Sequence, residues 1–190
     1  MIDNTFYYCI FAGKIITPMK KLSLSLLTFC LLTFCYAQEK AKPTLPSVNL
    51  KTLDGKTFNT KEIQNEGKPI LVSLWATWCK PCVAELNAIN DVYDEWQEET
   101  GVVLYAISID DTKTSAKVAP FVNGKGWDYV VLQDINGDFK RAMNVVDVPF
   151  LCLLNGKGEI VWQHTSYAPG SEKEVFELVK KIAKEEEINK

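Results

Sequence analysis

The chain has 190 residues, of which 47% are hydrophobic, so it can bury the core of one ordinary domain. Its formal net charge of −3 argues against nucleic acid as a partner, because phosphate contacts require clustered positive charge. Six cysteines stand beside a single histidine, a composition that offers few nitrogen ligands for a metal.

Residues 1–37 predict a leader that precedes the folded domain. Within 19–37, two lysines come before an apolar run, and small residues stand before Gln38, which is the order of a secretory signal peptide. Residues 1–18 match no part of such a signal, and we interpret them as an upstream extension ahead of a start at Met19. Removal of the leader, which carries +2, would change the net charge from −3 to −5.

A signal of this kind predicts export to the bacterial periplasm or cell envelope. The apolar segment 22–37 has 16 residues, short for a transmembrane helix, so cleavage is the first interpretation and an N-terminal membrane anchor is the alternative. Three cysteines belong to the leader, and Cys79, Cys82 and Cys152 remain. One pair with one extra thiol does not make a disulfide-stapled scaffold, so we interpret the domain as one that acts on the disulfides of other proteins.

Residues 38–46 contain two prolines and predict an extended linker before a domain at 47–190. Segments 48–50 and 56–58 flank the dipeptide Asp54-Gly55, which is typical of a tight turn between two strands. The domain is therefore expected to begin with a β-hairpin.

After the hairpin, segments of helix and strand character alternate. Strands are expected at 69–75, 102–109, 128–132, 150–154 and 159–165, the first of them buried on both faces. Helices are expected at 60–67, 79–101, 112–123, 137–143 and 171–182, with Thr60 and Ser171 as caps. This order predicts an α/β fold, a central mixed β-sheet with helices on both faces.

The sequence Trp78-Cys79-Lys80-Pro81-Cys82 lies between a buried strand and a helix start, where Pro81 is well suited. In a first helical turn, residues i and i+3 share one face with Cα atoms roughly 5–6 Å apart, a separation that a disulfide tolerates. The unpaired N–H groups of that turn and the charge of Lys80 favour the thiolate of Cys79. We therefore predict that Cys79 attacks a substrate disulfide and that Cys82 resolves the intermediate.

Two structural alternatives fit this pair of cysteines less well. A tetrahedral zinc site needs two more ligands, and only Cys152 and His164 remain outside the leader, so we expect no metal. A structural disulfide between Cys79 and Cys82 would close a short loop and add little stability. Cys152 stands within an apolar strand and is expected to be a buried, inert thiol.

Over about residues 47–182, these features resemble the exported TlpA/ResA-like thiol-disulfide oxidoreductases of the thioredoxin superfamily. The resemblance rests on the Trp-Cys-x-x-Cys motif after a buried strand, on Val148-Pro149 before a later strand, and on the closing hairpin. It implies a thioredoxin-like fold with an N-terminal β-hairpin and an inserted element, roughly 113–127, in the crossover.

The resemblance also implies roles for individual residues. Pro149 would follow a cis peptide bond beside the cysteines, and Val148 would pair its backbone with an extended substrate segment. Trp78 would cover the dithiol and contact the substrate. Lys80 and Pro81 would belong to the same contact surface and tune the redox potential.

Thioredoxin carries a buried acid six residues before its first cysteine, and Ser73 occupies that position here. Glu85 lies one helical turn after Cys82, where ResA-like proteins also carry an acid. We expect Glu85 to relay protons to Cys82 and to raise the energetic cost of forming a thiolate there. An exposed glutamate without such a role is the alternative.

The resemblance implies a reductive direction, in which a membrane thiol reductase supplies electrons and protein disulfides, including apocytochrome c cysteines, receive them. No cofactor is expected besides the redox-active disulfide Cys79–Cys82. Two alternatives stay open. One is a thioredoxin-fold binding module that holds a partner without turnover, and the other is a thiol peroxidase, for which Thr77 is a weak match.

Overall fold

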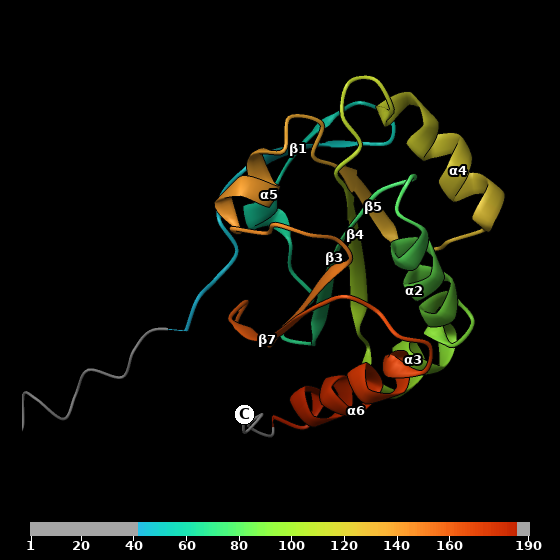
Figure 1. Ribbon diagram of the computed structural model, residues 1–190. Helices are drawn as coiled ribbons and strands as arrows, with labels where there is room; N and C mark the ends of the chain where they lie inside the picture. Colours follow the sequence, from blue (N-terminus) through green and yellow to red (C-terminus); the bar gives the residue numbers. More distant parts are fainter. Residues whose placement is uncertain (1–41, 186–190) are drawn as a thin grey trace, which may run out of the picture. The chain divides into compact units, whose positions relative to one another are not determined.

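The computed structural model describes residues 42–185, which form a seven-stranded mixed β-sheet with helices on both faces (Figure 1). The predicted leader, with its signal peptide and upstream extension, lies outside the described residues. The strands are β1 (Asn49–Thr52), β2 (Thr57–Asn59), β3 (Ile70–Trp75), β4 (Val103–Ser108), β5 (Val130–Gln133), β6 (Phe150–Leu154) and β7 (Ile160–Thr165). Their order across the sheet is β2-β1-β5-β4-β3-β6-β7. The predicted α/β class and mixed sheet are confirmed.

The centre of the sheet is β3, which pairs in parallel with β4 and antiparallel with β6. All six residues of β3 are buried, as expected for a strand with side chains covered on both faces. Leu71 and Val72 illustrate this, because they belong to the two separate apolar clusters on opposite faces of the sheet. The predicted central strand is confirmed.

The predicted N-terminal hairpin is also confirmed. β1 and β2 pair antiparallel with Leu50 opposite Phe58, and Gly55 has a φ of 81° in the turn between them. β1 then pairs antiparallel with β5, which extends the sheet by two strands. Of the predicted linker, residues 42–46 are described, and within them Thr44 forms a β-bridge to Glu159.

The short helix predicted at 60–67 is wrong in length and in its cap. Only a single 3₁₀ turn, η1 (Thr60–Glu62), forms, and its cap is Asn59, whose side chain accepts a hydrogen bond from the Lys61 N–H. The hydroxyl of Thr60 is buried and instead donates to the carbonyl of Pro46. Thr60 therefore fastens the preceding segment to the domain rather than starting a helix.

Helices cover the two faces of the sheet unequally. One face carries α2 (Lys80–Asn90), α3 (Tyr93–Thr100), α4 (Val118–Lys125) and α6 (Ser171–Ala183), and the other carries α5 (Asp138–Ala142) with η1. Figure 1 shows α2, α3 and α6 grouped along one side of the strands and α5 on the opposite side. Helices on both faces were predicted, and this is confirmed.

The single helix expected at 79–101 is two helices, separated at Asp91 and Val92. Val92 has φ −128°, which ends the first helix and redirects the second. The change of direction lets the hydroxyl of Tyr93 accept a hydrogen bond from the Leu104 N–H at 2.9 Å in the neighbouring strand β4. Gly101, with φ 67°, ends α3 as predicted.

The predicted inserted element is present in the crossover from β4 to β5, as the 3₁₀ turn η2 (Ser115–Lys117) and α4. The helix expected at 112–123 therefore starts later, and Pro120 is the third residue of α4, where no intrahelical N–H bond is lost. Gly126, with φ 66°, closes α4, so the helix ends later than the expected residue 123. At α6 the cap is Gly170 rather than Ser171.

Candidate functional site: a dithiol at the start of helix α2

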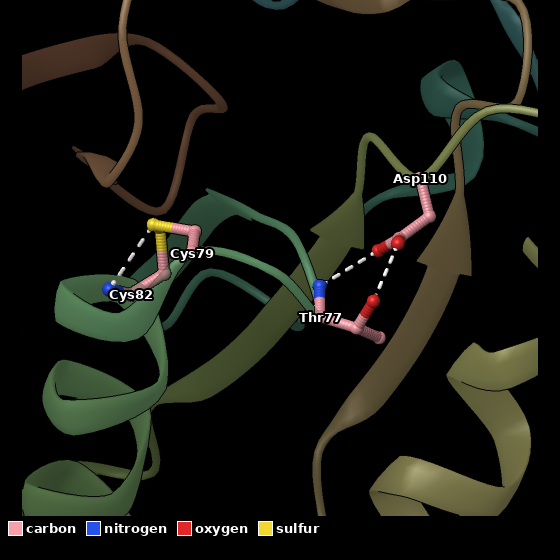
Figure 2. Close-up of a disulfide and its surroundings, with 4 residues drawn as sticks. All are labelled: Thr77, Cys79, Cys82 and Asp110. Carbon is pink, nitrogen blue, oxygen red and sulfur yellow. Dashed lines mark hydrogen bonds between the residues drawn. A yellow bond between two sulfur atoms is a disulfide. The ribbon is translucent and has the colours of Figure 1, made fainter. Parts of the chain in front are cut away.

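The paired cysteines lie where β3 passes into α2. A turn closed by the Cys79 N–H and the carbonyl of Ala76, 3.0 Å apart, follows the end of the strand. Cys79 is then the cap of α2, and its Sγ accepts a hydrogen bond from the Cys82 N–H at 3.3 Å. The two cysteines form a disulfide with Cα atoms 5.3 Å apart (Figure 2). This is the separation expected from the i, i+3 spacing.

The two sulfur-bearing residues differ in access to solvent. Cys79 is 5% exposed and Cys82 is fully buried, so the N-terminal cysteine is the one that an incoming sulfur can reach. Around it, Trp78 is 59% exposed, and Lys80 and Pro81 are also exposed. These three residues thus form an accessible rim next to Cys79, and the predicted role of Trp78 in covering the dithiol stays a prediction.

Val148 and Pro149 lie beside this turn because of the strand register. Phe150, the first residue of β6, pairs with Leu74 near the end of β3, so the residues before Phe150 lie at the edge where the dithiol turn begins. The Val148–Pro149 peptide bond is cis, as the resemblance implies. Pro149 is buried, and Val148 is half-buried and packs against the core.

Glu85 is buried in the first half of α2, one turn after Cys82, and only 4% of it is exposed. Its Oε2 has no hydrogen-bond partner, and burial raises the pKa of the carboxyl from 4.5 to about 7. The exposed-glutamate alternative is therefore wrong. A carboxyl with this pKa can take up or release a proton near neutral pH beside the buried sulfur.

Tyr167 and Ser73 are two other polar residues of this part of the structure. The pKa of Tyr167 is raised by partial burial, by its hydrogen bond to Glu172 and by the charge of Glu85, so this ring lies on the same side of the molecule. Ser73 is buried in β3 with a hydroxyl that has no partner. Because position 73 carries serine, Glu85 is the only acid at positions 73 and 85.

Sequence reasoning missed a set of hydrogen bonds behind the dithiol turn, the Asp110 network, formed by Asp110, Thr77 and Ser108. Asp110 is fully buried just after β4, and its carboxylate accepts from the Thr77 N–H at 2.8 Å, the Thr77 hydroxyl at 2.6 Å and the Ser108 hydroxyl at 2.8 Å. Figure 2 shows the carboxylate facing Thr77 on the side away from the disulfide. The sequence signal that could have indicated this network is the set of polar residues, Ser108 and Asp110 among them, at the end of the buried strand β4.

The remaining cysteine of the domain is separated from this chemistry. Cys152 is fully buried in β6, and burial raises the pKa of its thiol to about 12, which keeps it protonated and inert as predicted. His164 is exposed on β7, where its ring stacks on Trp162. Among residues 42–185, no three His, Cys, Asp or Glu side chains are grouped closely enough to share a metal ion.

Comparison with known proteins adds three findings. Residues 42–181 match the AhpC/TSA family. The sporulation thiol-disulfide oxidoreductase A of Bacillus subtilis is 26% identical over 64% of this chain and 73% of its own length, and the thiol:disulfide interchange protein DsbE of Haemophilus influenzae is 34% identical over 63% of each. The chain thus spans less than two thirds of the DsbE relative.

Among solved structures, a thioredoxin-like protein from Porphyromonas gingivalis is 50% identical with a TM-score of 0.67, covering 74% of this chain and 92% of its own. This agrees with the predicted thioredoxin-like fold. Within the described part of the chain, 42–185, no helix is both long enough and apolar enough to cross a membrane.

Proposed function

Because the chain belongs to the AhpC/TSA family and to the thioredoxin superfamily, we propose that it is an exported thiol-disulfide oxidoreductase that reduces protein disulfides. The relatives with printed functions are named for thiol-disulfide exchange, which supports the same activity here. The single observation that carries the proposal is a cysteine pair at a helix start with an unpartnered buried acid one turn away.

In the first step, the Cys79 thiolate attacks one sulfur of a substrate disulfide. A bond forms between Cys79 and that sulfur, the substrate S–S bond breaks, and the second substrate sulfur leaves as a thiolate that takes up a proton. The N–H groups at the start of α2 stabilise the Cys79 thiolate, and the Cys82 N–H already contacts its sulfur in the oxidised state.

In the second step, Cys82 attacks the Sγ of Cys79 and releases the substrate as a dithiol. Cys82 is fully buried and must lose its proton first, so a nearby acceptor lowers the barrier. Glu85 is that acceptor in the proposal, since its pKa of about 7 lets it accept a proton at neutral pH. The substrate gains two electrons, and the protein ends as the Cys79–Cys82 disulfide.

The substrate surface in this proposal is the rim described above together with the loop before β6. Val148 supplies backbone groups for an extended segment, and Trp78 supplies exposed apolar area next to Cys79. A membrane thiol reductase restores the dithiol by donating two electrons. Apocytochrome c cysteines are the proposed physiological class of substrate, in the periplasm or cell envelope.

Trapping of partners in intact cells tests the proposal. Cys82→Ser should accumulate mixed disulfides through Cys79, because the resolving sulfur is missing, whereas Cys79→Ser should accumulate none. Apocytochromes among the trapped proteins would support the substrate class, and a mature N-terminus at Gln38 would support export. A binding module without turnover would hold the same partners in both variants, without a covalent bond.

The direction of electron flow has its own measurement. A reduction potential near that of thioredoxin, about −270 mV, would support a reductase, and one near −120 mV would contradict it. The peroxidase alternative receives no support from Thr77, whose hydroxyl donates to Asp110 and is therefore engaged away from the sulfur.

A further inference from the structure

The turn that presents Cys79 is held from behind by Asp110, which lies just after the neighbouring strand β4. β3 and β4 run parallel with Trp75 opposite Ser108, so the chain leaves both strands at the same edge of the sheet. Asp110 follows Ser108 by two residues and reaches back to Thr77, which lies two residues before Cys79. The connection thus joins the start of the crossover to the dithiol turn.

The hydrogen bonds of the Asp110 network fix both the backbone and the side chain of Thr77. Oδ2 accepts from the Thr77 N–H and from the Ser108 hydroxyl, and Oδ1 accepts from the Thr77 hydroxyl. Ser108 is in turn bound to the Asp110 N–H at 3.1 Å, so the carboxylate itself is held in place. Every one of these contacts is buried or partly buried, where water competes little.

Thr77 occupies the inside of the turn from Ala76 to Cys79. At the end of this turn, Cys79 is held by α2, because the carbonyl of Cys79 accepts a hydrogen bond from the Val83 N–H at 3.1 Å. Without Asp110 the start of the turn would keep two backbone bonds, from the Cys79 N–H to the Ala76 carbonyl and from the Ile109 N–H to the Trp75 carbonyl, and neither of them holds Thr77. The position of one sulfur relative to the other therefore depends on Asp110 as well as on the helix.

We propose that Asp110 is a positioning residue that holds the Thr77 turn and thereby sets the balance between dithiol and disulfide. Two sulfurs held at bonding distance have a high effective concentration for each other, and loosening one of them lowers it. A looser turn thus weakens the internal disulfide relative to a mixed disulfide with a small thiol. This inference rests on the proposed exchange function and adds a residue to it.

The test is the equilibrium of the purified domain with reduced and oxidised glutathione, read by alkylation and mass shift. Thr77→Val keeps the side-chain size and the backbone bond but removes the hydroxyl bond, and should lower the equilibrium constant for the internal disulfide about threefold. Asp110→Ala removes the whole network and should lower it about tenfold, equivalent to about 30 mV. Asp110→Asn, which can keep the bonds of Thr77 and Ser108, should stay near the parent value.

A matched control is available on the neighbouring strand. Asp134 is 3% exposed at the end of β5, and its carboxylate accepts from the Phe139 and Lys140 N–H groups at the start of α5. Asp134→Ala should lower stability without moving the glutathione equilibrium. The positioning role would be overturned if Asp134→Ala shifted the glutathione equilibrium as much as Asp110→Ala does. It would also be overturned if neither Asp110→Ala nor Thr77→Val changed the equilibrium constant. Failure of the parent dithiol to cycle at all would instead overturn the proposed function.

Discussion

Two buried acids flank the dithiol turn, and they differ in the hydrogen bonds that their carboxyl groups accept. Asp110, behind the turn, accepts hydrogen bonds from three donors at 2.6 to 2.8 Å. Glu85, on the first helix, is almost as deeply buried, but its Oε2 accepts none. One carboxyl is thus surrounded by hydrogen-bond donors, and the other has a buried oxygen that accepts no hydrogen bond.

The difference shows how the same functional group can serve structure or proton transfer. A carboxylate with its donors in place fixes the groups around it, and its removal leaves those donors without partners. A carboxyl without donors is easier to protonate, which is why burial raises the pKa of Glu85 to about 7. Substitutions at the two positions should therefore affect different quantities.

The largest expected effect is on stability at Asp110. Asp110→Ala should lower the free energy of unfolding by about 4 kcal/mol, because three donors in buried or partly buried positions lose their acceptor. Urea unfolding of the oxidised domain measures it. Asp134→Ala, which leaves two backbone donors at a helix start, should cost about half as much. A loss below about 1 kcal/mol at Asp110 would show that water replaces the carboxylate there.

At Glu85 the expected effect on stability depends on pH. The folded-state pKa of about 7 lies above the ordinary value of 4.5, so the unfolded chain ionises first as the pH rises. The parent should therefore lose about 3 kcal/mol of stability between pH 4.5 and pH 7, a contribution fully present only below that window. Glu85→Gln should lack this part of the pH dependence.

Urea unfolding of the parent and of Glu85→Gln at a series of pH values gives the comparison. The two proteins should have similar stability at pH 4, and the variant should be the more stable at pH 8. Parallel stability curves for the two proteins across this range would show that Glu85 is not held protonated by burial.

The rate of thiol-disulfide exchange should also respond differently to substitutions of Glu85 and Asp110. Glu85→Gln removes the proton acceptor of Cys82 and should slow reduction of a protein disulfide about a hundredfold at pH 7, at the lower end of acid–base contributions. The pKa values of both thiols in the reduced protein, followed by alkylation rate, should change as well. Asp110→Asn is the control, since it removes the other buried acid near the dithiol turn without removing this proton acceptor.

Much of this arrangement could be predicted from the sequence because it depends on local spacing. The separation of Cys79 and Cys82 follows from helix geometry, and the buried strand before them follows from its uninterrupted apolar run. The hairpin at Gly55 and the end of α3 at Gly101 follow from residues that favour a positive φ. These features need no knowledge of distant contacts.

The features that were missed depend on partners far away in the sequence. Asp110 lies 33 residues from Thr77, and nothing in its local pattern says which donors it will meet. The break before Tyr93 is similar, since it brings the hydroxyl of that residue to the N–H of Leu104, on another element. At Glu85 the spacing indicated the correct face of the helix, but the depth of burial required the neighbouring elements.

The smallest expected effect is at Ser73, the position where thioredoxin has an acid. Its hydroxyl is buried without a partner, so Ser73→Ala should change the free energy of unfolding by less than about 0.5 kcal/mol and leave the exchange rate within about twofold. Urea unfolding and the same disulfide reduction assay measure both. If Ser73→Ala slowed exchange as much as Glu85→Gln, the proton path would run through the strand as well as the helix. An unchanged rate in Ser73→Ala, together with a slower rate in Glu85→Gln, would place the proton acceptor of Cys82 on α2, one turn from the sulfur that it serves.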